Sequence, residues 1–323
     1  MVQVPSDEKA TPDRSSRSFT AAYVVAIVVC GLVAGVPTGW LVANKIKNDA
    51  GMGYDGPRLW YLHIPKTATP FMLEVAYGVC PDMDRVDITT PECADAPETC
   101  VFGTSDWSGC SHNFLHMAPG HDVISDDDPF WSERVMVGMF RDPTTRVASG
   151  FVHAFHDCPT MTSRYGCDEH SPDLCPGVDH MTEDKVREYF ECVKECQGRM
   201  VTGHACSAGA FKGGSPVDAE AAVRRIEENF VYVGITERFH DSVVDFHKLA
   251  GDPHTVPESA FVHSNTNRGG RRGDELEKEV AEIIKALGLV DEVDEAVYAA
   301  ALRKNDEFHA HAQLAGAGMG KRQ

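Results

Sequence analysis

Three short apolar runs, each followed by a segment with helical periodicity, constrain the fold of this chain more than any other feature. The runs are RLWYLHI (58–64), VMVGMF (135–140) and VYVGIT (231–236). None alternates polar with apolar residues, which is typical of strands that are buried on both faces. Because buried strands that alternate with helices form layered structures, we predict an α/β fold with a mainly parallel central sheet.

Helical patterns follow each predicted strand and fill the tail of the chain. The segment RDPTTRVASGFVHAF opens a helix in which Pro143 suits the first turn. Between residues 158 and 214 the sequence predicts one helix, near Glu183 to Cys196, and Ser215–Pro216 is predicted as the cap and first turn of the next. The other predicted helices are PFMLEVAYGV (70–79), VDAEAAVRRIEENF (217–230), ERFHDSVVDFHKLAG (237–251), DELEKEVAEIIKALG (274–288) and DEVDEAVYAAALRKNDEF (291–308).

An uncharged stretch of 25 residues, from Phe19 to Ala43, separates a short polar head from the rest of the chain. It is long enough to span a bilayer as one tilted helix. A cleavable signal peptide is the alternative, but its apolar region would cover about 7 to 15 residues and lie nearer the start. The predicted organisation is a cytosolic tail (1–18), a transmembrane anchor (19–43), a stem (44–57) and a lumenal domain (58–323).

The anchor also carries a pattern that bears on its partners. Gly31, Gly35 and Gly39 form two overlapping G-x-x-x-G units on one helix face, which would let two anchors pack closely in a homodimer. The alternative is that glycine is common in membrane helices. The charge of the chain bears on a second kind of partner, nucleic acid, because 30 Lys and Arg against 49 Asp and Glu give a net charge of -19. A nucleic acid is therefore not expected to bind, and an anionic ligand needs a local basic pocket.

Cysteine usage indicates the compartment. Of eleven cysteines, Cys30 falls in the anchor and ten fall between residues 80 and 206. An even number on one side of a membrane predicts up to five disulfides in an oxidising lumen. Zinc is the alternative, but no C-x-x-C occurs and Cys192-x-x-x-Cys196 lacks a matching pair. The ten are Cys80, Cys93, Cys100, Cys110, Cys158, Cys167, Cys175, Cys192, Cys196 and Cys206.

Two of the predicted strands are followed by basic residues. The first leads into Pro65-Lys66-Thr67 and then a helix, so helix N–H groups and one lysine can converge on a phosphate. A plain surface turn is the alternative for so short a motif, and no G-x-x-x-x-G-K-[ST] sequence occurs. Arg141 directly follows the second strand, and Ser149 lies eight residues further on. Because ligands of open α/β sheets bind outside the carboxyl ends of the strands, we predict two phosphate-sized sites there.

These segments resemble a known family. HIPKTA with FMLEVAYGVC, then VGMFRDPTTRVASGF, then FVYVGITERFHDSVVDFHKL are similar in order and spacing to the Golgi-type carbohydrate sulfotransferases, nearest to the uronyl and heparan sulfate 2-O-sulfotransferase group. The likeness covers residues 59–80, 112–155 and 222–250. It implies a P-loop-like three-layer fold, the donor 3′-phosphoadenosine 5′-phosphosulfate (PAPS) and no obligatory metal. It also implies a glycan acceptor, with uronate-containing glycans as one candidate class, and a single-pass type II protein of the Golgi membrane.

The resemblance further implies roles for individual residues. Lys66 corresponds to the cation beside the bridging oxygen that gains charge as the sulfuryl group leaves, with Thr67 assisting by a hydrogen bond. Arg141 and Ser149 correspond to the site for the 3′ phosphate, and the V-G-I-T-E strand supports the sheet without reacting. The implied donor-binding residues of the first loop are Lys66, Thr67, Ala68 and Thr69.

A histidine general base is implied between the two donor motifs. The segment SHNFLHMAPGH offers His116, which best matches the family's aromatic-then-histidine context, with His112 and His121 as alternatives and a purely structural histidine as another. In NRGGRRG, Arg271 and Arg272 are predicted to lie in a flexible loop that closes over the 3′ phosphate or an anionic glycan. A solvated loop without a ligand is the alternative.

The chain departs from the family at the end of the first loop. Pro70 offers no N–H, and in a gapless alignment Phe71 stands where the family has a small hydroxyl residue. A one-residue shift is the alternative, which would place Thr69 at the hydroxyl position and shorten the loop. Pro70 and Phe71 bear on donor affinity and keep two further hypotheses open. One is a catalytically decayed lumenal homologue that binds a glycan or a protein partner. The other is a disulfide-stapled membrane interaction protein with no nucleotide site.

Overall fold

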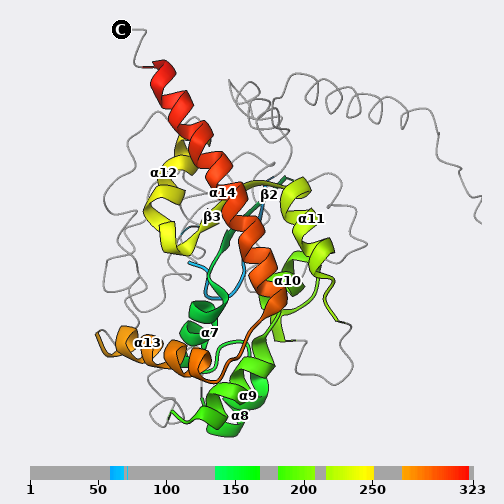
Figure 1. Ribbon diagram of the computed structural model, residues 1–323, viewed down its shortest axis with the longest axis vertical. Helices are drawn as coiled ribbons and strands as arrows, with labels where there is room; N and C mark the ends of the chain where they lie inside the picture. Colours follow the sequence, from blue (N-terminus) through cyan, green and yellow to red (C-terminus); the bar gives the residue numbers. More distant parts are fainter. Residues whose placement is uncertain are drawn as a thin grey trace, which may run out of the picture. The chain divides into compact units, whose positions relative to one another are not determined.

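Figure 1 shows the computed structural model of the chain, which describes residues 59–68, 71, 135–167, 181–207, 216–250 and 271–319. The chain divides into two units, Met1–Lys45 and Ile46–Gln323, and all of the described residues belong to the second. The predicted anchor at 19–43 lies outside them. Within the described part of the chain, no helix combines the length and the apolar character that a bilayer span requires.

A parallel sheet of three strands confirms the central prediction. The strands are β1 (Leu59–Leu62), β2 (Val135–Phe140) and β3 (Phe230–Ile235), in the order β1-β2-β3. Leu62 pairs with Gly138, and Phe140 pairs with Ile235. All three predicted apolar runs are therefore strands, and the chain leaves each of them at the same edge of the sheet.

The helix after β2 begins where the sequence predicts. Helix α7 spans Pro143–Val152, with Pro143 in its first turn and Asp142 as its cap. The Asp142 carboxylate accepts a hydrogen bond of 2.9 Å from the Thr145 N–H. This cap fixes how the chain turns from the sheet edge into the helix.

The predicted helix from Glu183 to Cys196 is wrong as one element, because it is two. Helix α9 spans Glu183–Val193 and helix α10 spans Cys196–Val201. Between them Glu195 adopts a left-handed backbone with φ 63°, and its N–H donates to the Asp291 carboxylate at 2.7 Å. The break is therefore held by a residue almost a hundred positions away, which local periodicity cannot show. The sequence also missed the short helix α8 (Pro159–Tyr165).

The remaining predicted helices within the described residues follow the predicted order with shifted bounds, and the last one runs to Met319 rather than ending at residue 308. The predicted helix 70–79 lies outside the described residues except for Phe71. Asp218, rather than Ser215, caps the helix after the cysteine-rich region, since its side chain accepts from Ala221 N–H at 3.1 Å. Arg271 and Arg272 begin a helix and do not lie in a loop. The elements are α11 (Ala219–Asn229), η5 (Thr236–Arg238), α12 (Phe239–Ala250), α13 (Arg271–Ala286) and α14 (Glu292–Met319). Figure 1 shows α14 passing β3 with α11 and α12 beside it, and α14 contacts all three.

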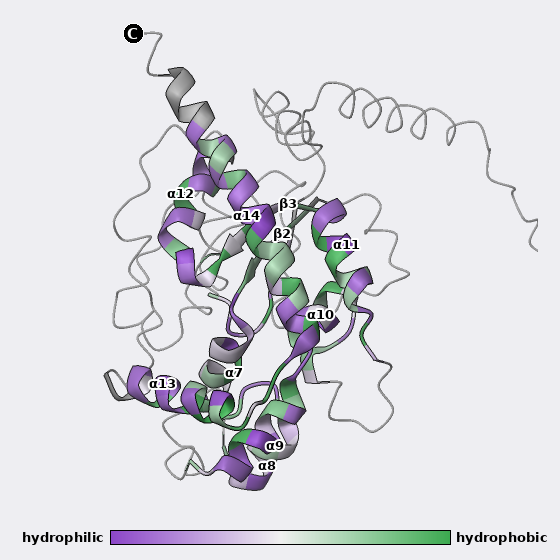
Figure 2. Ribbon diagram, viewed as in Figure 1, coloured by the Kyte–Doolittle hydropathy of each residue, from purple (hydrophilic) through white to green (hydrophobic). Residues whose placement is uncertain are grey.

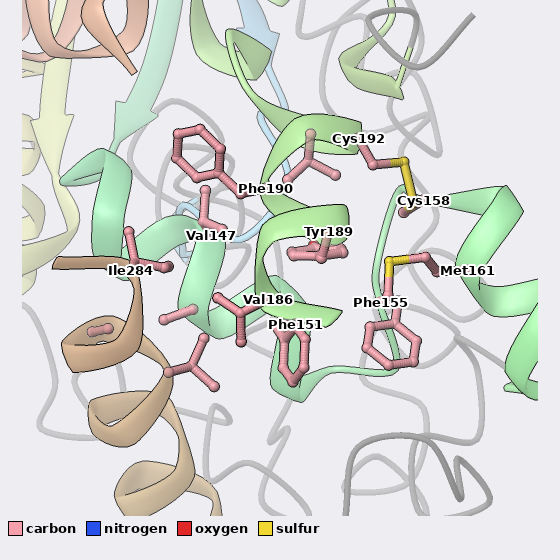
Figure 3. Packing of buried hydrophobic residues seen from close by; sticks show 14 of the residues in the cluster. Val147, Phe151, Phe155, Cys158, Met161, Val186, Tyr189, Phe190, Cys192 and Ile284 are labelled. Atoms are coloured by element: carbon pink, nitrogen blue, oxygen red, sulfur yellow. A yellow bond between two sulfur atoms is a disulfide. The ribbon is translucent and has the colours of Figure 1, made fainter. Parts of the chain in front are cut away.

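A buried aromatic cluster joins α7, α9 and α13. Phe151 of α7 packs edge to face on Tyr189 of α9, with ring centroids 5.7 Å apart, and on Phe155, 5.0 Å away. Figure 3 shows these side chains in one cluster with Ile284 of α13. Helix α13 is otherwise largely hydrophilic, as its purple colour in Figure 2 shows, so it contacts the core through one apolar stripe. This packing holds α13 against α7.

Disulfides confirm part of the cysteine prediction. Cys158 pairs with Cys192, and Cys196 pairs with Cys206. Cys167 is also disulfide-bonded. Cys192 and Cys196 therefore have different partners, which excludes a shared metal site for this pair. The other predicted disulfide cysteines lie outside the described residues.

We expect the Cys158→Ala/Cys192→Ala variant to lose about 2–4 kcal/mol of the free energy of unfolding, because the bond limits the unfolded chain. The cross-link joins residues 34 positions apart, whereas Cys196–Cys206 joins residues 10 apart. Chain entropy therefore makes the second bond weaker by about 1 kcal/mol. Urea unfolding of both double variants measures this. An equal or larger loss for the Cys196→Ala/Cys206→Ala variant would contradict the entropic account.

Candidate functional site

The loop after β1 has a tight backbone that the sequence alone does not reveal. Lys66 and Ala68 adopt left-handed conformations, with φ 64° and 71°. Such conformations cost non-glycine residues about 1–3 kcal/mol each and cluster at functional sites. Thr67 is buried, and its hydroxyl donates to the Ile64 carbonyl at 2.7 Å. Thr67 therefore fixes the shape of the loop that presents Lys66.

Arg141 lies directly against this loop. Its Nη1 donates to the Lys66 carbonyl oxygen at 3.3 Å, although the two residues are 75 positions apart. Its Nε donates to the Thr145 hydroxyl at 3.3 Å. The structure thus brings the two sequence motifs together at one edge of the sheet, where the parallel strands β1 and β2 end.

A carboxylate that the sequence analysis missed completes the surroundings of Arg141. Glu277 of α13 forms an ion pair with Nη2 of Arg141, and both side chains are largely buried, with 18% and 16% exposed. A charge-assisted pair of this kind is stronger than a neutral hydrogen bond. An anion that binds Arg141 must therefore share the guanidinium with Glu277 or displace it.

The electrostatic environment of Lys66 lowers the pKa of its ammonium to about 8. Burial is the largest cause, and the positive charge of Arg141 lowers the pKa further. The carboxylates of Glu277 and Asp157 act in the opposite direction. Lys66 is therefore a cation at neutral pH that loses its proton more readily than an exposed lysine.

Ser149 lies on the same helix that Arg141 introduces. It is buried in α7, with 4% of its surface exposed, about 9 Å along the helix axis from Pro143 at 1.5 Å per residue. The pairing of Ser149 with Arg141 at one phosphate stays a prediction. Thr69, His116, His112 and His121 lie outside the described residues.

Glu237, in the short helix η5 after β3, forms hydrogen bonds with the start of α7. Its Oε1 accepts from the Asp142 N–H at 3.1 Å and from the Thr145 hydroxyl at 3.2 Å. Its Oε2 accepts from the Tyr298 hydroxyl at 3.0 Å. The Asp142 and Thr145 N–H groups therefore already have acceptors and are not open to a ligand at this edge. The supporting, non-reacting role expected for the V-G-I-T-E segment stays a prediction.

A turn after α7 brings the carboxylate of Asp157 toward Lys66. Ala154, Phe155 and Asp157 all have left-handed backbones, and the Tyr189 hydroxyl donates to the His156 carbonyl at 2.7 Å. His156 Nε2 lies 3.5 Å from an Asp157 carboxylate oxygen. The Asp157 charge reaches Lys66 and raises its pKa.

Asp294, in the first turn of α14, is a fully buried carboxylate. It accepts hydrogen bonds from the N–H groups of Gln197, at 3.1 Å, and Gly198, at 2.9 Å, and lies 3.6 Å from Nε of Arg146. Burial and then the nearby Asp291 raise its pKa to about 7, against the lowering effects of Arg146 and the two N–H groups. Asp294 therefore titrates near neutral pH.

This raised pKa gives a stability change of predictable sign. The folded chain keeps a proton on Asp294 up to pH about 7, whereas an unfolded aspartate releases it near its ordinary value of 3.8. The contribution to the free energy of unfolding therefore falls as pH rises between these values. Between pH 5 and 7 we therefore expect the free energy of unfolding to fall.

Urea unfolding of the wild type and of Asp294→Asn at pH 5 and at pH 7.5 isolates this group. The advantage of the wild type over the variant is expected to shrink at the higher pH, because the amide does not titrate. If that advantage grew instead, the ion pair with Arg146 would outweigh burial and the pKa would be low.

Comparison with known proteins adds no family assignment: no protein-family model matches the chain, and no curated protein is significantly similar to it. Among the described residues, no group of three or more His, Cys, Asp or Glu side chains is arranged to hold a metal ion. The site is therefore defined by its own residues, namely Lys66 on its strained loop, Arg141, and the carboxylate of Glu277.

Proposed function

We propose that this chain is a PAPS-dependent carbohydrate sulfotransferase. In this proposal the sheet edge belongs to a P-loop-like three-layer domain, which lies in the Golgi lumen behind a single-pass type II anchor. The observation that carries the proposal is the contact between the Arg141 guanidinium and the Lys66 carbonyl. PAPS carries phosphate groups at both ends of its ribose, and two neighbouring cations on adjacent strand ends are suited to such a ligand.

Sulfuryl transfer requires the acceptor oxygen, sulfur and leaving oxygen to lie in line. The bond between sulfur and the acceptor oxygen forms while the bond between sulfur and the bridging phosphate oxygen breaks. The acceptor hydroxyl gives its proton to a base, for which His116 remains the predicted residue. Negative charge develops on the leaving phosphate, and Lys66 in its protonated form stabilises it.

The acceptor in this proposal is a hydroxyl of a glycan, with uronate-containing chains as the first class to test. Lys66 and Arg141 contribute positive charge to a domain whose net charge is strongly negative. Such local charge is what an anionic donor and an anionic glycan need at short range, since the domain as a whole repels them.

One observation favours a second function. Glu277 pairs with the arginine that would bind the donor phosphate, and Pro70 and Phe71 depart from the family loop. A lumenal homologue that binds a glycan or a protein partner without catalysis would tolerate both features. It would not need Arg141 to be available to a nucleotide.

Incubation of the full chain in detergent with labelled PAPS and a panel of glycans, with and without uronates, tests the proposal. Calorimetry with 3′-phosphoadenosine 5′-phosphate (PAP), the product nucleotide, measures donor-site binding in the same preparation. Label transfer with PAP binding supports the enzyme. Glycan binding without label transfer and without PAP binding supports the second function. PAP binding without transfer to any glycan supports the nucleotide site but contradicts a glycan as the acceptor.

A further inference from the structure

The backbone of Arg141 is held by the side chain of Gln197. The Arg141 N–H donates to Oε1 of Gln197 at 3.0 Å, and Nε2 of Gln197 donates to the Arg141 carbonyl at 2.9 Å. Gln197 is completely buried. A buried carboxamide is costly unless its donor and acceptor are both bonded, and here one residue's backbone satisfies both.

This pair of bonds replaces a strand partner. The pairing of β2 with β1 ends at Gly138, and its pairing with β3 ends at Phe140. Arg141 therefore lies one residue beyond the ladder, where its backbone groups have no partner from either strand. In a sheet, one residue's N–H and C=O commonly bond together to the neighbouring chain. The Gln197 amide supplies that pair and extends the ordered backbone by one residue.

Gln197 is itself fixed from several directions. Its N–H and that of Gly198 both donate to the Asp294 carboxylate, and the residue before it, Cys196, is cross-linked to Cys206. A Cβ on Gly198 would lie 2.5 Å from a Val293 methyl group, so this position needs glycine for α10 to approach α14 closely. Helix α10 therefore cannot shift without breaking these contacts.

The contacts of Gln197 and Asp294 extend to α7, the helix that follows Arg141. Arg146 of α7 is buried, lies 3.6 Å from the Asp294 carboxylate, and donates from Nη2 to the Val193 carbonyl at 2.8 Å. A closed series of contacts thus runs from Arg141 through Gln197 and Asp294 to α7. It fixes both the backbone of Arg141 and the helix after it, and Gln197, Asp294 and Arg146 are buried away from solvent.

We propose that Gln197 is a positioning residue for donor binding: its carboxamide holds the Arg141 backbone so that the guanidinium faces the Lys66 loop. This inference rests on the proposed function, because the donor phosphate is what the positioned guanidinium would bind. Gln197 does not contact the ligand in this scheme. Its loss should raise the PAPS KM and leave the acceptor KM and the turnover at saturating donor near their wild-type values.

Gln197→Met tests the proposal, because methionine has a similar length and volume but cannot form either hydrogen bond. We expect PAP to bind about 10-fold to 100-fold more weakly, which corresponds to about 1.4–2.8 kcal/mol. Thr202→Val is the matched control, since the buried Thr202 hydroxyl donates within α10, to Gly198 at 2.9 Å and Arg199 at 3.1 Å, without touching Arg141. It should lower thermal stability and leave the PAP Kd unchanged.

Gln197→Glu is the second variant if the methionine protein does not fold. A carboxylate keeps the acceptor for the Arg141 N–H but has no donor for its carbonyl, so weaker PAP binding is again expected. Wild-type affinity in the folded variants, or equal weakening in Thr202→Val, would overturn the positioning role while PAP binding by the wild type upholds the donor site. A wild-type protein that does not bind PAP would overturn both.

Discussion

Lys66→Ala is expected to lower kcat for sulfuryl transfer by about 10²-fold to 10³-fold or more, because removal of one stabiliser of transition-state charge costs two to three orders of magnitude or more. The lost ammonium is the cation nearest the bond that breaks in the proposed reaction. Alanine is a better substitution than glycine, because it keeps the Cβ of Lys66 and so does not relax a backbone whose φ is 64°. Turnover at saturating PAPS, measured with labelled donor, gives the effect on chemistry apart from binding.

The pH dependence of transfer distinguishes Lys66 from a residue that merely supports the loop. The protonated form is the active one, and the pKa in the free protein is lowered to about 8, so kcat/KM for PAPS should fall as pH rises through that value. Lys66→Arg should move this loss to higher pH, because a guanidinium stays charged. A wild-type rate that stays constant to pH 10, or a Lys66→Ala variant with normal turnover, would remove Lys66 from the chemistry.

The sequence predicted the sheet because the three apolar runs carry their own signal. The run VMVGMF lies between polar residues and matches β2 residue for residue, and Pro143 and Asp142 mark the start of α7 just as helix-capping chemistry requires. Once parallel strands were inferred, their shared carboxyl edge followed. The proximity of Lys66 to Arg141 was thus predictable from topology, although the two residues are 75 positions apart in the sequence.

The residues that surround Arg141 could not be predicted in this way. Gln197 is 56 positions from Arg141, and Glu277 is 136 positions away. Each lies in a helix whose sequence shows no unusual pattern of polar and apolar residues. No local feature therefore indicates which side chain contacts Arg141. The break between α9 and α10 has the same origin, because Asp291 holds it from a distant segment. Tertiary contacts decide these details.

Arg141→Ala is expected to weaken PAP binding about 10²-fold to 10³-fold, because it removes the guanidinium that would pair with a phosphate in two hydrogen bonds. The substitution also leaves Glu277 without its ion-pair partner, which adds repulsion toward an anionic ligand. Calorimetry with PAP measures the total effect. The Arg141→Ala/Glu277→Ala double variant removes the unpaired carboxylate and isolates the loss of the guanidinium alone.

Glu277→Gln should have the opposite effect and bind PAP about 3-fold to 10-fold more tightly, because a neutral amide competes less well for Arg141 than a carboxylate does. The two substitutions change neighbouring groups of one ion pair, so general damage to the site would weaken binding in both. Opposite signs require that the nucleotide and Glu277 compete for the same guanidinium. An Arg141→Ala protein with wild-type affinity, or a Glu277→Gln protein with weaker binding, would place the donor elsewhere.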